Sequence, residues 1–244
     1  MGFQDRKADQ IDAEAKAGYL EFELGAKRLK ALKRFNRKHN TTLTQLVSSA
    51  WTILLWRATG LNLPVQMVNN LRDRIEFETV MGDFSSALPM ILDINPGTRV
   101  SDLFQAYDQA MTDLQRHKRC NVPELLRSLN SQKGSNHDAH NWGAVTIDSN
   151  DRDSLLDTSG FTDRVISLKP EDRDPPGQLL ILVVKTDERL SLHYLYDTRC
   201  LTRKTMKLIV EGMDVLLKQI LAAPECLIGE LLIPKKLKKR LLVR

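Results

Sequence analysis

The chain has 244 residues, of which 42% are hydrophobic and 27% are charged, and its formal net charge is +5. This composition is typical of a globular protein that buries its core in one large domain or two small ones. No apolar run approaches the roughly 20 residues that span a bilayer, and the polar N-terminus is not a secretory signal. Cys120, Cys200 and Cys226 lie far apart without Cys-x-x-Cys spacing, which favours reduced thiols in a cytoplasmic protein over a disulfide framework or a zinc site.

The first predicted elements are a strand and a basic helix. Residues 4–16 are polar and predict a frayed helix or disorder, whereas residues 19–24 alternate with period two and predict a strand that ends at Gly25. Leu29, Leu32 and Phe35 recur at helical spacing and predict a helix that ends near residues 39–40. The opposite side of this helix is basic, with Lys27, Arg28, Lys30, Lys33, Arg34, Arg37 and Lys38.

The second predicted helix is apolar nearly all round, so we expect it at the centre of the core. Thr41 or Thr42 can cap its start, and Gly60 is expected to stop it. Residues 63–70 predict a strand with Pro64 near its beginning, where a missing amide donor is tolerated.

The middle of the chain predicts a strand, a turn and a helix. Residues 87–94 predict the strand, and Asn95-Pro96-Gly97 predicts the turn, in which Gly97 is expected to supply a positive φ. Ser101 is expected to cap a helix that runs to about residue 118. Pro123 is expected to open a short helix through residue 129.

The last part of the chain predicts further strands and one long helix. The expected strands cover residues 142–148, 165–168, 179–186 and 190–196, and the last two form a hairpin with a short loop. Thr202 is expected to cap a helix that runs to about residue 223. These elements together indicate an α/β or α+β fold, in which helices flank a mixed β-sheet.

The segment Gly82-Asp83-Phe84-Ser85 lies between two predicted strands and resembles the Gly-x-Phe signature in the second half of nonribosomal peptide synthetase condensation domains. Its Gly-Asp-Phe-Ser form is similar to the heterocyclization branch of that family. The element order from about residue 19 to about residue 234 resembles the C-terminal lobe of such a domain, whose fold is similar to chloramphenicol acetyltransferase. This resemblance divides the chain into a polar extension (1–16), the lobe (17–232) and a basic linker or tail (233–244).

Other segments follow the order of the family pattern. Residues 42–60 are similar to its helix with a threonine-glycine stop, and Val68-Asn69-Asn70-Leu71-Arg72 is similar to its strand followed by Asn-Arg. His117 with Val122-Pro123-Glu124 resembles its His…Val-Pro-Phe-Glu stretch, although Glu124 stands where Phe is expected and the spacing is longer. Residues 192–197 and 227–232 resemble its closing strand and its linker into an adenylation domain.

The His-His-x-x-x-Asp-Gly motif of the family occurs nowhere in these residues. In the family, its second His orients or deprotonates the acceptor amine. The resemblance therefore implies half of a condensation domain in peptide biosynthesis, which needs an N-terminal lobe for catalysis or serves as a truncated, non-catalytic scaffold. His137 and His140 have a spacing that could hold a metal, but they stand in a polar segment without an obvious third ligand, so we predict no metal site.

The resemblance also implies candidate site residues. Four residues would line the passage between the lobes: Gly82, Asp83, Phe84 and Ser85. A structural interpretation stays open, in which Gly82 forms a tight turn and Phe84 is a core anchor. Thr146 is the counterpart of a threonine thought to assist cyclodehydration, but Lys169 falls where the assisting aspartate would be. Alternatively, the Thr146 hydroxyl donates to a backbone carbonyl.

The implied partners are other synthetase domains. An adenylation domain would contact residues 231–244, and a carrier domain would bring the phosphopantetheine arm, so that no cofactor is bound directly. The basic helix could dock the acidic carrier or the phosphate of its arm, through Lys27, Arg28, Lys30 and Arg34. A solvated basic face is the alternative. Nucleic acid is not expected, because no aromatic residues interleave with the basic tail, and neither is a membrane.

Two further functions stay open from the sequence. The first is a stand-alone module that docks a carrier protein through the basic helix. The second is a small acyltransferase of the chloramphenicol acetyltransferase type, for which His193 and Asp197 have His-x-x-x-Asp spacing on one face of a predicted strand. A cap on the turn into the last helix is the alternative role of Asp197.

Overall fold

A computed structural model of the chain describes residues 3–4, 17–82, 84–122, 124–125, 127–128, 144–145, 179–185, 190–238 and 240–243. The elements in chain order are β1 (Phe3–Gln4), β2 (Ala17–Leu24), α1 (Ala26–His39), α2 (Leu43–Thr59), β3 (Val65–Asn70), the 3₁₀ helix η2 (Ile75–Phe77), β4 (Ser85–Met90), α3 (Val100–Arg116), β5 (Ala144–Val145), β6 (Leu179–Lys185), β7 (Leu190–Asp197), α5 (Arg203–Ala222), the 3₁₀ helix η5 (Ile228–Glu230) and β8 (Leu242–Val243).

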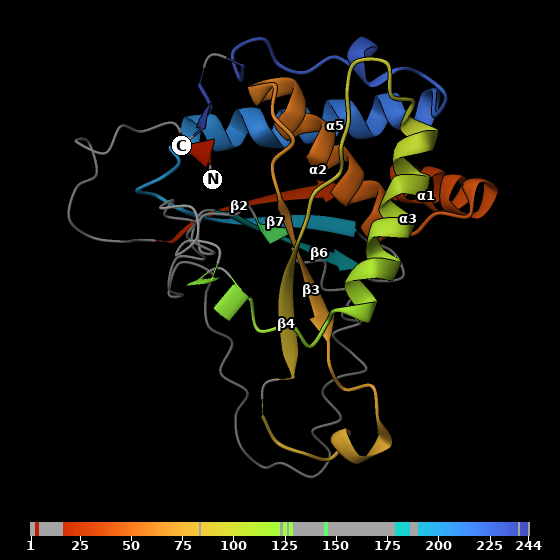
Figure 1. The fold of residues 1–244 in the computed structure, drawn as a ribbon. Helices are drawn as coiled ribbons and strands as arrows, with labels where there is room; N and C mark the ends of the chain where they lie inside the picture. Colours follow the sequence, from red (N-terminus) through yellow and green to blue (C-terminus); the bar gives the residue numbers. More distant parts are fainter. Residues whose placement is uncertain are drawn as a thin grey trace, which may run out of the picture.

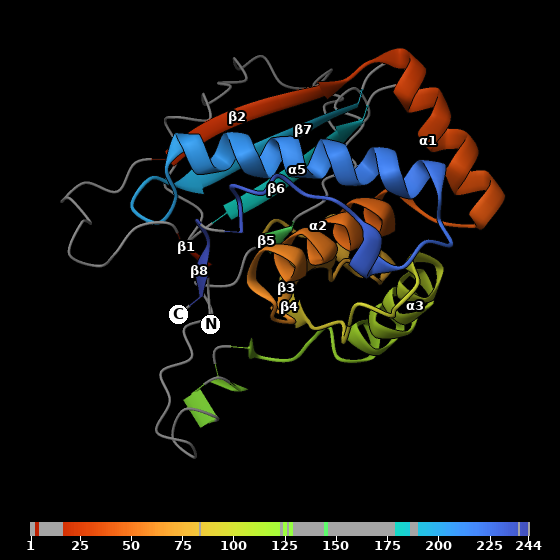
Figure 2. The same cartoon turned by 90° about the horizontal axis from the view of Figure 1, so that it is seen from above.

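The described strands form a six-stranded sheet in the order β2-β7-β6-β5-β3-β4 and a separate pair of β1 with β8. Within the sheet, β5 runs parallel to both β3 and β6, and the other neighbours are antiparallel. Figures 1 and 2 show α2 and α5 lying over the same face of this sheet, with α1 beyond α5 and α3 beyond α2. The predicted mixed sheet flanked by helices is therefore confirmed.

The core lies between this helical layer and the sheet. Thr42 begins α2 with a capping box, in which the Thr42 side chain and the Gln45 side chain each accept from the other residue's backbone N–H. Gly60 ends α2 with a left-handed φ of 75°. Nearly every side of α2 is buried, and Thr202 caps α5, which packs beside it. The predictions for both ends of α2 and for the start of α5 are confirmed.

The strand predicted for residues 87–94 is displaced. β4 begins at Ser85 and ends at Met90, because it pairs with the whole of β3, from Asn70 opposite Ser85 to Val65 opposite Met90. The motif serine Ser85 is therefore the first residue of the strand. Hydrophobicity alone does not predict this start, because the pairing of polar residues with β3 decides it.

Two predictions at the following turn and helix are wrong. Among the described glycines, only Gly60 and Gly82 have a positive φ. Asn95 closes the turn at Gly97 instead, since its Oδ1 accepts from the Gly97 N–H at 2.9 Å. Ser101 lies inside α3, whose N-cap is Arg99, and its hydroxyl donates to Glu225 at 2.9 Å.

The C-terminal segment folds back on the helical layer. Ile233, Leu237 and Leu241 belong to the same buried cluster as α2 and α5. The Gln219 side chain of α5 donates to the carbonyl of Leu232 and accepts from its N–H, at 3.0 Å each. The segment expected as a basic linker or tail thus contributes to the core. None of the described helices has the length and apolarity needed to cross a bilayer.

Several expectations lie outside the described residues. Asp83, Thr146 and Lys169 are among them, together with the strand expected at 165–168 and the polar segment around His137.

Candidate functional site

The motif segment lies at the end of a two-stranded arm formed by β3 and β4. Figure 1 shows these strands extending away from the helical layer, with η2 near the far end. Residues 71–84 connect the strands there, and the Leu71 N–H donates to the Phe84 carbonyl at 2.7 Å to close the connection. The position of the motif is therefore set by the hydrogen bonds of the β3–β4 ribbon.

Arg72 holds this connection together. Its guanidinium donates to the backbone carbonyl of Phe77, to that of Val80 at 2.8 Å and to that of Gly82 at 2.9 Å. The same guanidinium lies 4.2 Å from the centre of the Phe84 ring, and that ring lies 5.3 Å from the Phe77 ring. We call this arrangement the Arg72 clamp. A charged donor that satisfies three carbonyls and stacks on an aromatic ring gives the loop a defined shape without a core of its own.

The geometry of the clamp explains why glycine stands at position 82 and phenylalanine at position 84. Gly82 has a φ of 146°, which side chains other than hydrogen rarely allow. Phe84 is half-buried between Arg72 and Phe77, outside the main core cluster, and Ser85 is exposed at the start of β4. The structural interpretation of Gly82 is thus supported, whereas Phe84 anchors the loop and not the main core.

The connection at the end of the arm is tied to the segment after α3 by polar contacts. Lys118 Nζ and Arg119 Nη2 lie 2.7 and 2.8 Å from the two carboxylate oxygens of Asp73. The hydrogen bond from Lys118, together with the charges of both cations, lowers the pKa of the Asp73 carboxyl from its ordinary value of 3.8. Within β3, the buried Asn69 accepts from Gln115 of α3 at 2.9 Å. These side chains are far apart in sequence, so periodicity gave no signal for their contact.

Large apolar side chains are exposed near the end of the arm. Met81 is 99% exposed, Ile75 76% and Val80 44%. All three lie on the connection whose backbone the Arg72 clamp holds, and we call these three residues the arm tip. Exposed apolar groups gathered in one place are typical of an interaction site.

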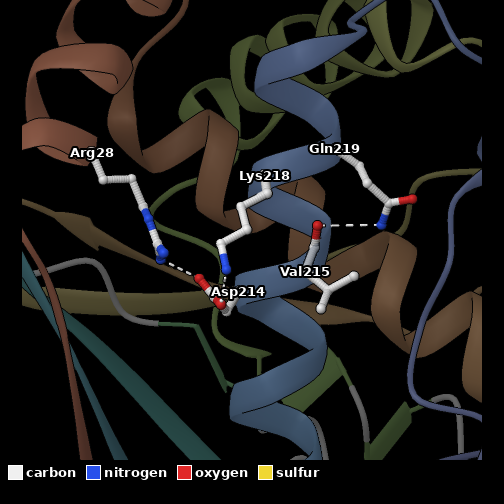
Figure 3. A network of polar contacts seen from close by, with 5 residues as sticks. All are labelled: Arg28, Asp214, Val215, Lys218 and Gln219. Carbon is white, nitrogen blue, oxygen red and sulfur yellow. Dashed lines mark hydrogen bonds and ion pairs between the residues drawn. The ribbon is translucent and has the colours of Figure 1, made fainter.

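The basic helix is only partly available to a partner. Arg28 forms an ion pair with Asp214 of α5, and Lys218 Nζ lies 2.7 Å from the other oxygen of the same carboxylate (Figure 3). Lys27, Lys30 and Arg34 are exposed. A hollow of about 300 Å³ lies between the end of α1 and the end of α5, lined by Ala31, Arg34, Phe35, Lys38, His39, Leu221, Ala222 and Pro224.

The contacts of His193 and Asp197 differ from those of a His-x-x-x-Asp pair. The buried Asp197 carboxylate accepts from the Arg199 guanidinium, with Nη2 at 2.6 Å, and from the Arg199 N–H at 2.8 Å. This supports the interpretation of Asp197 as a cap on the turn before α5. His193 Nδ1 lies 2.7 Å from the Tyr19 hydroxyl, and His193 Nε2 lies 2.9 Å from the Ser191 hydroxyl. Among the described residues, no group of three His, Cys, Asp or Glu side chains could hold a metal.

Comparison with known proteins identifies the family of this chain. The family model described as "Condensation domain" matches residues 4–243. N-(5-amino-5-carboxypentanoyl)-L-cysteinyl-D-valine synthase from Amycolatopsis lactamdurans is 26% identical over 115 residues, which are 47% of this chain and 3% of that protein.

Solved structures agree with this match at the level of the fold. The first condensation domain of the CDA synthetase has a TM-score of 0.68 at 18% identity, over 93% of this chain and 50% of that one. The X-domain from teicoplanin biosynthesis has a TM-score of 0.70 at 18% identity, over 89% and 50%. The four-domain nonribosomal peptide synthetase AB3403, bound to AMP and glycine, has a TM-score of 0.71 at 16% identity, over 88% and 17%. The predicted chloramphenicol acetyltransferase-like α/β fold is therefore confirmed, and the chain spans about half the length of the single domains that it matches.

Proposed function

Because the chain belongs to the condensation-domain family of nonribosomal peptide synthetases, we propose that its residues form the C-terminal half of such a domain. This half would provide the acceptor-side wall of the substrate passage and would not catalyse amide formation alone. The observation that carries the proposal is one of coverage: 93% of the chain superimposes on only 50% of a solved condensation domain. The absence of His-His-x-x-x-Asp-Gly from the sequence supports it.

Such a half acts by positioning its substrates. Two thioester-linked substrates held in reacting geometry can account for roughly 7–11 kcal/mol of barrier lowering. The missing histidine would add proton transfer, which contributes a factor of about 10² to 10⁴. A wall that positions substrates must keep its shape, and the Arg72 clamp supports this role because it fixes Gly82, Phe84 and the residues before them.

The arm tip is the surface that we assign to the contact with the N-terminal lobe. Met81 and Ile75 are exposed on a loop whose backbone is already ordered, so binding would bury apolar area with little loss of loop entropy. The motif residues Asp83 and Ser85 would then lie beside the passage between the lobes. Thr146 stays a prediction for heterocyclization chemistry.

The neighbouring domains follow from the same proposal. Residues 231–244 would carry the contact with an adenylation domain, through a segment whose apolar side chains are already packed on α5. The acceptor would arrive on the phosphopantetheine arm of a carrier domain.

A carrier-docking module is the second candidate function. The observation that favours it is that α1 contains lysines and arginines but no acidic residue. Lys27, Lys30 and Arg34 are exposed along it, whereas Arg28 is largely occupied by Asp214. Docking through this helix would weaken steeply with added salt, and a triple Lys27→Ala, Lys30→Ala, Arg34→Ala variant would lose it.

The proposed function is tested by measuring amide formation between a loaded donor carrier and a loaded acceptor carrier by intact mass. The chain is assayed alone and with a separately made N-terminal lobe that carries His-His-x-x-x-Asp-Gly. Product only in the presence of both halves supports the proposal. Product from the chain alone contradicts it. No product from the folded pair, together with salt-sensitive carrier binding, would favour the docking module.

A further inference from the structure

A group of polar side chains lies on the sheet where β2 and β7 pair. Tyr19 and Glu21 belong to β2, Ser191 and His193 belong to β7, and Glu21 is directly opposite His193. Their strand neighbours Leu192, Tyr194 and Tyr196 point into the core beneath the helices. Because side chains alternate along a strand, the polar group lies on the sheet face opposite the helical layer.

The hydrogen bonds within this group run in one direction. A carboxylate can only accept, so Glu21 Oε2 accepts from the Tyr19 hydroxyl at 3.2 Å. The Tyr19 oxygen, 2.7 Å from His193 Nδ1, then accepts from the imidazole. We assign the imidazole proton to Nδ1 on this basis, so that His193 Nε2, 2.9 Å from the Ser191 hydroxyl, is the acceptor of the serine proton.

This order matches the arrangement that activates a serine. A hydroxyl becomes nucleophilic when a neighbouring imidazole takes its proton and a third group holds the imidazole in the correct tautomer. Here the third group is Tyr19, which is itself oriented by Glu21. Glu21 Oε1 also lies 4.0 Å from His193 Nε2, where its charge favours the imidazolium that forms during attack.

The group is sheltered and still reachable. The His193 side chain is 19% exposed, the Glu21 side chain is 48% exposed, and Ser191 is partly exposed. A small acyl donor can therefore approach the Ser191 hydroxyl. Partial burial strengthens the hydrogen bonds of His193 with Tyr19 and Ser191 relative to the same bonds in water.

We propose that Ser191 is an activated nucleophile that captures acyl groups from activated esters or thioesters, with His193 as its general base. In this step the Ser191 oxygen forms a bond to the acyl carbon, and the bond from that carbon to the leaving oxygen or sulfur breaks. The serine proton moves to His193 Nε2 and from there to the departing alkoxide or thiolate. The activity is separate from amide formation and requires no N-terminal lobe.

The test is acetylation of the full chain by p-nitrophenyl acetate, followed by intact mass and peptide mapping. We expect one acetyl group on Ser191, and its rate of addition should rise between about pH 5 and 8, where imidazoles titrate. The His193→Asn variant should acetylate Ser191 about 100-fold more slowly and lose this pH dependence, because a general base contributes a factor of at least about 10². Tyr19→Phe should slow the reaction less, since it removes only the orienting hydroxyl.

A matched control comes from Ser101, whose hydroxyl donates to the Glu225 carboxylate without an imidazole. The Ser101→Ala variant should be acetylated at Ser191 at the wild-type rate, and Ser191→Ala should lose the mapped product while circular dichroism shows a folded chain. The proposal is overturned if wild-type acetyl maps to other residues. It is also overturned if His193→Asn reacts at Ser191 as fast as the wild type with the same pH profile. The wild-type mapping and pH profile decide the question even if a variant fails to fold.

Discussion

The helical layer and the connection at the end of the β3–β4 arm are stabilised by different forces. The layer of α2 and α5 is held by buried apolar side chains, among them Leu54 and Ile209, both fully buried. The connection of residues 71–84 at the end of the arm has no buried side chain among its described residues, and it depends on the Arg72 clamp and on the contacts of Asp73 with Lys118 and Arg119. Global stability and the shape of the candidate site can therefore be changed separately.

The largest expected effect is on the helical layer. Leu54→Ala should lower the free energy of unfolding by about 2–5 kcal/mol, because it leaves a cavity in a well-packed core. Leu232→Ala is the matched control, since Leu232 is 66% exposed and should change stability by no more than about 0.5 kcal/mol. Denaturant unfolding measures both. Equal effects of the two changes would contradict the assignment of the core.

A smaller effect is expected at the backbone of the arm. Gly82→Ala should cost about 1–3 kcal/mol locally, because alanine is strained at a φ of 146°. Gly25→Ala is the control, since Gly25 has a φ of −60° and open space around an added Cβ. Hydrogen exchange at Leu71, whose N–H closes the connection, should accelerate only in the Gly82 variant.

The clamp itself should contribute about 1 kcal/mol, the net value of hydrogen bonds that remain partly accessible to water. Arg72→Ala should therefore raise exchange in residues 71–84 while the denaturation midpoint changes little. Arg72→Lys should not restore protection, because an ammonium group lacks the planar set of donors that reaches three carbonyls. Full protection in Arg72→Lys would show that charge alone holds the loop.

The smallest expected effect is on the pH dependence of hydrogen exchange near Asp73. The pKa of Asp73 is lowered in the folded protein by Lys118 and Arg119. Its contribution is therefore present above the unfolded value of 3.8 and is lost as the pH falls through the lower folded value. Hydrogen exchange in the connection around Asp73 should rise in this acidic range in the wild type. In Asp73→Asn it should already be raised at neutral pH and should show no such transition.

The two regions also differ in how far the sequence predicts them. Helical spacing and end signals such as Thr42, Gly60 and Thr202 predict the helices of the layer, because each signal acts locally. Ser101 misled the prediction because a serine near a helix start was assumed to cap it, whereas its hydroxyl bonds a residue distant in sequence.

The candidate site is harder to predict from the sequence, because its contacts join residues that are distant along the chain. The motif around Gly82 indicates the family, but the clamp depends on Arg72 reaching carbonyls up to ten residues away. Likewise, the spacing of His193 suggests a partner at Asp197, whereas strand pairing brings it to Tyr19 of β2. Contacts across strands are set by register, which one sequence shows only weakly.

The most direct test of the central claim is the association of this chain with a separately made N-terminal lobe, measured by sedimentation equilibrium. We expect a one-to-one complex that Met81→Glu weakens at least about tenfold, because the change places a charge in a buried apolar contact. Leu232→Glu, at another exposed apolar position away from the arm, should leave the affinity unchanged. A folded chain that forms no complex with the lobe would contradict the claim that these residues are one half of a condensation domain. If Met81→Glu leaves the affinity for the N-terminal lobe unchanged, only the contact assigned to the arm tip is contradicted.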